Sequence, residues 1–439
     1  MIADITAFGA VGDGATLNTA AIQSAVDACA EAGGGTVVVP PGVFMTGTVF
    51  LYSRLTFHLE AGAVLLGSPN IDDYCTDDAY PQNWPCAAEG WRGAHILVAV
   101  GAEDVQVTGP GAVDGNAEAY LEQKPHFDGT DWLGGFSWAR GYRNNAPEKM
   151  PYRPGQMLVF VQCRRVRVTD LTLRNSPCWS CFLHGCREAV IRGLFIDNPV
   201  DGANSDGIDI DCCSQVTVSD CVIRTGDDAI TLRASGRKIP DVPAVCEDVA
   251  ITNCVLDTSV CGFRIGVGNG LIRNATISNI VLRHAGRGFL LQSSYGRKGL
   301  GVTIRDLAVS DVRGDHVGHP VCIEAGEGET GDAAIENIRF SDLHIQCAGG
   351  LQIHGSDVLR PKDIAFTNCS FTVVRRDHPG DPARMPTHFL DFARADGVRL
   401  SGCELVWRDP EPEWQGARNI RDVTGFLLDN SRFAGGGLK

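Results

Sequence analysis

Short runs in which hydrophobic and polar residues alternate recur along almost the whole chain. Each run ends in a small or turn-forming polar residue, usually Asn, Asp or Gly, and most are followed by a second alternating run. Strict alternation is typical of strands that bury one face. Successive runs commonly begin 24 to 36 residues apart, which is a solenoid period. Clear examples are Gln215–Asp220, Asp248–Asn253, Asn274–Asn279 and Asn337–Asp342.

These repeats predict an all-β fold, a right-handed parallel β-helix with about three short strands in each coil. Units this short cannot bury their own apolar face, so they must stack on one another. The repeats lack the helical half of a leucine-rich or ankyrin unit. We expect the recurring Asn and Asp at sharp turns, where their side chains bond local backbone and tolerate left-handed geometry. We also expect one domain over residues 1–439.

The start of the chain predicts a short helix that caps the open end of the solenoid. Asn18 is a favourable N-cap, and Gly33–Gly35 would end the helix. Between them, Ile22, Val26 and Cys29 fall on one helical face.

The composition narrows the classes of partner. The chain is 44% hydrophobic with 52 glycines, which suits many short strands and tight turns. Its net charge of −15 argues against nucleic acid or an anionic membrane surface as the main partner. No apolar run approaches the roughly 18 residues of a membrane span. The first residues lack the regions of a signal peptide, so we expect a cytoplasmic protein, or a secreted or periplasmic one if a leader has been removed.

The 17 cysteines are an odd number and are scattered through strand-like segments. Several occupy equivalent repeat positions, where Cys serves as a small buried hydrophobe. We therefore expect reduced core thiols in a reducing compartment rather than a disulfide framework. Cys178 and Cys181 form a C-x-x-C pair without a suitable second pair, so their expected role is packing. We predict no metal and no cofactor.

Acidic residues gather in two short segments, Asn204–Asp211 and Gly226–Asp228. Asp206 precedes Asp227 by 21 residues and Asp228 by 22, about one coil. Stacked coils place equivalent positions about 4.8 Å apart, so three carboxylates would crowd together. Their mutual repulsion is expected to raise at least one pKa, leaving a protonated acid beside ionised neighbours. That is the equipment for hydrolysing a glycosidic bond. The alternatives are an acidic wall of the solenoid or a Ca²⁺ site.

Two long segments, about 67–100 and 116–155, interrupt the repeats and are rich in aromatic residues with Arg and His. Long loops on a regular scaffold usually carry function, and these residue types suit stacking on sugars. We count Trp138 and Arg153 as candidate substrate contacts. The alternative is that the loops only cover the flank of the solenoid.

Taken together, these motifs resemble glycoside hydrolase family 28, the polygalacturonase and rhamnogalacturonase family. The resemblance runs nearly the whole length and implies a right-handed β-helix, inversion of anomeric configuration and an oligosaccharide or polysaccharide substrate. By motif, Asp227 would be the general acid, Asp206 and Asp228 would activate the water, and Asn204 would hold the local turn and contact a substrate hydroxyl. The matching segments are Ala7–Gly14, Gly109–Gly115, Arg153–Pro154, Asn175–Trp179, Asn204–Gly207 and Gly226–Asp228.

The chain departs from the family at the positions around the acids. Cys261 stands where the family has a histidine that assists the carboxylates, and Arg264 stands where it has a serine. Leu290 and Gln292 stand at the two basic positions that hold the galacturonate carboxylate, and a Leu cannot pair a carboxylate. Arg264 would either bind a uronate carboxylate bidentately or neutralise the surplus of Asp. Other candidate contacts are His184, Tyr295 and Glu324, with Arg287 and His284 as further cationic groups.

The leading hypothesis is an inverting glycoside hydrolase, polygalacturonase-like, acting on an α-linked pectic or related plant oligosaccharide. Because no leader is visible and long loops are available to close one end of a groove, we expect exo action. The first alternative keeps the fold but makes the protein a polysaccharide lyase or a glycan transferase. The second is a non-enzymatic, carbohydrate-binding β-helix.

Overall fold

The computed structural model describes residues 1–77, 93–121, 153–200, 202, 204–235, 243–294, 301–325, 333–375, 387–409 and 414–435. The chain divides into two compact units, and among these residues the first ends at Gly226 and the second begins at Asp227. The single domain stays a prediction.

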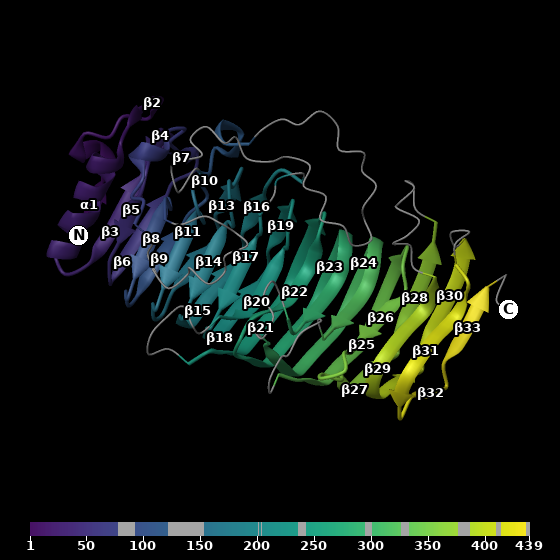
Figure 1. Cartoon of the computed structure of the whole chain (residues 1–439). Coiled ribbons are helices and arrows are strands. Elements are labelled where there is room, and N and C mark those ends of the chain that lie inside the picture. Colours follow the sequence, from purple (N-terminus) through teal and green to yellow (C-terminus); the bar gives the residue numbers. More distant parts are fainter. Residues whose placement is uncertain are drawn as a thin grey trace. The chain divides into compact units, whose positions relative to one another are not determined.

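Three rows of parallel strands build the first unit, and successive coils of the chain extend these rows (Figure 1). The first row contains β1 (Ile2–Asp4), β3 (Gly35–Val39), β6 (Leu55–Leu59), β9 (Val105–Thr108), β12 (Arg167–Thr169), β15 (Arg187–Arg192) and β18 (Ser214–Ser219). The second contains β2 (Asp13–Leu17), β4 (Gly42–Thr46), β7 (Ala63–Gly67), β10 (Ala112–Asp114), β13 (Thr172–Arg174), β16 (Phe195–Asp197) and β19 (Val222–Thr225). The third contains β5 (Val49–Leu51), β8 (Leu97–Val100), β11 (Leu158–Val161), β14 (Cys181–His184) and β17 (Ile208–Asp211).

In the second unit several strands run on through a corner of the coil, so one strand pairs with two others. The pairings are again parallel. The strands are β20 (Ile230–Ala234), β21 (Val245–Thr258), β22 (Cys261–Gly268), β23 (Leu271–Gln292), β24 (Thr303–Glu324), β25 (Ile335–Cys347), β26 (Leu351–His354), β27 (Lys362–Thr367), β28 (Ser370–Val374), β29 (His388–Ser401), β30 (Glu404–Asp409), β31 (Gly416–Thr424), β32 (Leu427–Asp429) and β33 (Arg432–Gly435). The predicted all-β, right-handed parallel β-helix is confirmed.

The predicted turn residues bend the chain where the coils change direction. Asp248, Asn253 and Asn279 have φ angles of 55°, 57° and 56°, in the left-handed region. Among ordinary residues Asn and Asp tolerate this region best. The amides also stack from coil to coil, since Asn279 Nδ2 donates to Asn253 Oδ1 over 2.6 Å. The same residues therefore set the bend and link neighbouring coils.

The N-terminal helix α1 (Thr19–Glu31) confirms the predicted cap. Ile22, Val26 and Cys29 are buried as expected. The Asn18 side chain makes no capping hydrogen bond. Instead its Oδ1 accepts from Val11 N over 2.7 Å, and its Nδ2 donates to Val11 O and Thr16 O. Asn18 therefore secures the preceding loop rather than the helix terminus. Within the described ranges, no helix has the length and apolarity needed to cross a membrane.

The described residues also include three short 3₁₀ helices, η1 (Ile5–Phe8), η2 (Ile71–Asp73) and η4 (Ala117–Ala119). Of the sixteen cysteines within the described ranges, all except the half-buried Cys75 are buried, and none forms a disulfide. Cys178 packs with Trp179 and Phe182, so its predicted packing role is confirmed.

Aromatic rings stacked from coil to coil fill the interior of the second unit. Phe263 and Phe289 are register partners whose rings are parallel within 2° and 5.0 Å apart. The Phe289 ring also meets Phe340 edge-on at 6.0 Å, and Phe340 stacks on Phe366 at 4.9 Å. All four side chains are buried. The rings therefore form a continuous packed column through several coils.

We predict that Phe289→Ala lowers the free energy of unfolding by about 3–5 kcal/mol, because it opens a cavity between two other rings. Phe195→Ala is the matched control, since Phe195 is 60% exposed, and a surface change of this kind shifts stability by about 0.5 kcal/mol or less. Urea denaturation followed by circular dichroism measures both. Equal midpoints for the two variants would contradict this account of the core.

Candidate active site

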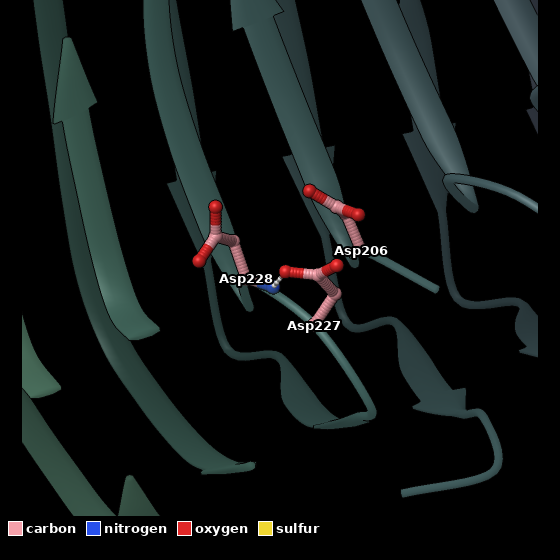
Figure 2. Close-up of side chains that lie close together, drawn as sticks. All are labelled: Asp206, Asp227 and Asp228. Atoms are coloured by element: carbon pink, nitrogen blue, oxygen red, sulfur yellow. Dashed lines mark hydrogen bonds between the residues drawn. The ribbon is translucent and has the colours of Figure 1, made fainter. Parts of the chain in front are cut away.

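The three predicted catalytic acids lie in short segments just before strands. Asp206 comes just before β17, and Asp227 and Asp228 come just before β20. All three side chains are buried, with exposed fractions of 4%, 5% and 4%. One carboxylate oxygen from each lies within 4.8 Å of the other two (Figure 2). The structure therefore brings together the three carboxylates that the spacing predicts.

The backbone around Asp206 is fixed by serine hydroxyls and amides. Ser180 donates twice to the Asp206 carbonyl, from its N over 2.9 Å and from its Oγ over 3.1 Å. The Oγ of Ser205 accepts from Gly226 N over 2.9 Å and donates to Gly202 O over 2.8 Å. The Asn198 amide donates to both Ser180 Oγ and Ser205 O. These bonds hold Asp206 in place without using its carboxylate.

Asn204 has a φ of 51°, so it holds the predicted left-handed turn beside Asp206. Its Oδ1 accepts from Arg153 over 3.0 Å, and Arg153 also donates to Pro177 O over 2.5 Å. Arg153 is only 1% exposed. The hydrogen bonds from Arg153 to Asn204 and Pro177 stabilise the turn. Direct substrate contact by Arg153 or Asn204 stays a prediction.

The Asp227–Asp228 pair is held by its own backbone and by the next coil. Asp228 N donates to Asp227 Oδ1 over 3.0 Å, the bond drawn in Figure 2. Thr258 Oγ1 donates to the Asp227 carbonyl, and Ala229 N donates to Cys261 O over 2.8 Å. Sequence reasoning missed Thr258, Ser205 and Asn198, because hydroxyl and amide residues are too common in such turns to stand out.

Arg264 begins a chain of polar contacts that leads away from Asp228. Its guanidinium lies 3.6 Å from Asp228 Oδ2, with both side chains almost fully buried. It also donates to Gln292 Oε1 over 2.7 Å, and Gln292 Nε2 donates to Glu324 Oε2 over 2.8 Å. Arg264, Gln292 and Glu324 therefore lie together, and substrate contact by Gln292 and Glu324 stays a prediction. The contacts to Asp228 and Gln292 favour the neutralising role of Arg264, and its substrate contact stays a prediction.

Cys261, predicted to stand in place of the family's histidine, is the first residue of β22. The thiol is fully buried, and burial, followed by the charge of Asp228, raises its pKa well above the ordinary value. It packs with Leu290 and Cys322 in a small apolar cluster. Cys261 therefore offers a neutral thiol, a weak hydrogen-bond donor, in place of an imidazole that carries charge near neutral pH.

Of the remaining predicted substrate contacts, His184 is described and Trp138 and Tyr295 are not. His184 is fully buried, with its Nδ1 3.4 Å from Asp211 Oδ2 and its ring 5.3 Å from that of Phe182. This environment fits packing, and its role in the site wall stays a prediction. Trp138, Tyr295 and most of the two aromatic loops lie outside the described residues. Two loop aromatics that are described, Tyr74 and Tyr120, are buried and both donate to Ser68 O.

A cation could also use the three carboxylates, because oxygen ligands suit Ca²⁺ and the three side chains each offer one within 4.8 Å. However, Arg264 already places a positive charge 3.6 Å from Asp228. This guanidinium partly offsets the negative charge that would attract a metal ion.

Comparison with known proteins connects this site to a family. The family model described as "Glycosyl hydrolases family 28" matches residues 83–246, and "Rhamnogalacturonase A/epimerase, pectate lyase-like" matches residues 2–76. A probable polygalacturonase of Vitis vinifera is 32% identical over 238 residues, which cover 53% of this chain and 44% of that protein. An exo-poly-alpha-D-galacturonosidase of Dickeya chrysanthemi is 30% identical over 264 residues, covering 53% and 42%. The chain thus spans less than half the length of these two curated relatives.

A solved structure extends the likeness over the whole fold. The exopolygalacturonase from Thermotoga maritima aligns with a TM-score of 0.68 over 97% of this chain and 92% of that chain, at 19% identity. At that identity the likeness shows the fold alone. With the family model and the curated relatives, the predicted resemblance to glycoside hydrolase family 28 is confirmed.

We predict that Arg264→Met lowers the free energy of unfolding by about 3 kcal/mol or more, because it leaves the buried Asp228 carboxylate without its cation. Adding Asp228→Asn should restore part of this loss, since the uncompensated charge is then removed. Denaturant titration of the wild type, both single variants and the double variant completes the cycle. Strictly additive losses would show that the two side chains do not interact.

Proposed function

We propose that this protein is an inverting glycoside hydrolase that cleaves α-linked pectic oligosaccharides, acting from a chain end. The observation that carries the proposal is the group of three buried carboxylates whose nearest oxygens lie within 4.8 Å, beside the buried Arg264. Paired carboxyl groups are the chemical equipment of glycoside hydrolysis, one as acid and one as base. Family membership and the activities named for the relatives support this reaction over the alternatives.

Each acid has a role that fits its contacts. Asp227 protonates the glycosidic oxygen, so that the bond between that oxygen and the anomeric carbon breaks with the electron pair leaving on oxygen. Asp206 and Asp228 orient a water molecule and take its proton as it attacks the anomeric carbon from the opposite face. Asp228 Oδ1 is buried and makes no hydrogen bond to a described residue, so it offers an acceptor to that water.

The stereochemical outcome follows from the family resemblance rather than from the spacing. Inverting enzymes usually separate their two carboxyl groups by about 6.5–9.5 Å, and retaining enzymes by about 5–5.5 Å. The 4.8 Å value joins the nearest oxygens, which lie closer than whole carboxyl groups do. Direct observation of the product anomer is therefore the deciding measurement.

We predict that the wild-type protein releases the β-anomer first from α-linked oligogalacturonides, and that Asp227→Asn lowers kcat by about 10²–10⁴-fold by removing the general acid. Proton NMR of the nascent product and reducing-sugar assays measure these effects. Asp220→Asn is the matched control, because Asp220 lies at an exposed turn with a φ of 58° that Asn tolerates. An α-anomer would refute inversion, and an unsaturated product absorbing in the near ultraviolet would indicate a lyase. Full activity in Asp227→Asn would remove the proposed acid.

We predict slow loss of polymer viscosity for each bond that is hydrolysed, because an exo-acting enzyme removes sugars from chain ends and leaves the polymer long. Viscosity and reducing-end release are followed together on polygalacturonate. The two curves should match those of a known exo-acting enzyme. A rapid fall in viscosity at low conversion would instead establish internal cleavage.

A further inference from the structure

Two arginines lie near the acids in the second unit, and their surroundings differ. Arg264 and Arg287 both belong to parallel strands that pair beside β20, since β22 pairs with β20 and β23 pairs with β22. The side chain of Arg264 is 5% exposed and that of Arg287 is 18% exposed. The first is enclosed, whereas the second retains access to solvent.

The contacts of Arg264 use its charge within the protein. Its guanidinium faces the Asp228 carboxylate at 3.6 Å and donates to Gln292 over 2.7 Å. Gln292 in turn donates to Glu324. The Arg264 guanidinium is therefore held by Asp228 on one side and by Gln292 on the other. A substrate that recruited Arg264 would have to take it from the buried Asp228 carboxylate, which is costly to leave without a partner.

Arg287 is much less committed. Its guanidinium lies 4.0 Å from Glu324 Oε1, the outer limit for an ion pair. Its Nε is buried and makes no hydrogen bond to any described residue. A guanidinium carries five N–H donors in a planar fork that matches a carboxylate. The difference between the two arginines lies in their terminal nitrogens, since those of Arg264 face Asp228 at 3.6 Å and Gln292 at 2.7 Å, whereas Arg287 lies 4.0 Å from Glu324.

The register places Arg287 close to the acids. The Cα of Arg287 is the partner of Cys261, and Ala229, next to Asp228, donates to the Cys261 carbonyl. Arg287 is therefore two rungs from Asp228, about 10 Å at the usual rung spacing. That distance suits a group on a sugar ring whose scissile bond lies at the acids.

Arg287 lies beside the apolar cluster of Cys261, Leu290 and Cys322. Leu290 and Cys322 are register partners and pack with Cys261. Burial opposes the charge of Arg287, but Cys322, Cys261 and Glu324 outweigh it and raise its pKa. The guanidinium thus stays charged in a partly dry environment, where a charge-assisted pair is stronger than in water.

We propose that Arg287 is the specificity-determining cation of this site and that it binds the carboxylate of a uronate residue next to the scissile bond. This inference rests on the proposed function and assigns the residue that recognises the charge of its substrate. Arg264, by contrast, is a positioning residue for Asp228. The chain thereby recognises an anionic sugar although Leu290 and Gln292 stand at the family's two basic positions.

The test compares anionic and neutral forms of one substrate. Kinetics are measured with oligogalacturonides and with their methyl esters, for the wild type, Arg287→Gln, Arg287→Lys and the control Arg273→Gln. Arg273 lies on the same strand, β23, but pairs with Glu247 over 2.6 Å, away from the apolar cluster. We expect Arg287→Gln to raise KM for the acid by about 10- to 100-fold, with kcat and the ester changed little. Arg287→Lys should recover part of the loss, because it keeps the charge without the fork.

Equal losses on acid and ester would overturn the proposal, since they indicate a structural role, and so would an unchanged KM. A second measurement separates this outcome from failure of the proposed function. Calorimetric titration of galacturonate and its methyl ester into Asp227→Asn, with and without Arg287→Gln, requires no turnover. Binding of the acid that depends on Arg287 would support the inference even if no hydrolysis were found. Hydrolysis of the acid with binding independent of Arg287 would refute the inference alone. Thermal unfolding of each variant shows that the fold is intact.

Discussion

The parallel register between successive coils is the constraint on which this structure depends. Each strand pairs with the equivalent strand of the next coil, so residues far apart in sequence become neighbours about 4.8 Å apart. Arg264, Leu290 and Cys322 form one such row, although 26 and then 32 residues separate them. Because the side-chain period is two, a slip of one residue would turn such a row from the outer face to the core. The left-handed Asn and Asp turns keep each coil at a length that preserves the row.

On that scaffold, electrostatics decide what the site tolerates. Three carboxylates are buried within a few ångströms, and such a group is stable only if cations, hydrogen bonds or protons compensate its charge. Arg264 supplies the nearest cation to Asp228, and Gln292 and Glu324 fix its position. Cys261 contributes a buried thiol whose raised pKa keeps it neutral, so it adds no charge there. The charge of the site therefore depends more heavily on its two arginines.

Fold and function are established by different features of the molecule. The stacked coils, the ring column of Phe263 and Phe289, and the turn residues support the architecture of this chain. Function lies in a few side chains placed on that architecture. Cys261, Leu290 and Gln292 all keep regular register partners, so the side chains at these positions set local chemistry without disturbing the coils.

The sequence by itself determined the fold class, the N-terminal helix and the three acids. Alternation and turn residues are local signals, and the spacing of Asp206, Asp227 and Asp228 is close to one coil. The tertiary structure decided which partners each side chain has. No local pattern indicates that Asn18 bonds to Val11 instead of capping α1, or that Thr258 secures Asp227. It also separated two arginines that look alike in the sequence, because burial and pairing depend on neighbours from other coils. Arg264 is enclosed by Asp228 and Gln292, whereas the Arg287 side chain is 18% exposed and lies 4.0 Å from Glu324.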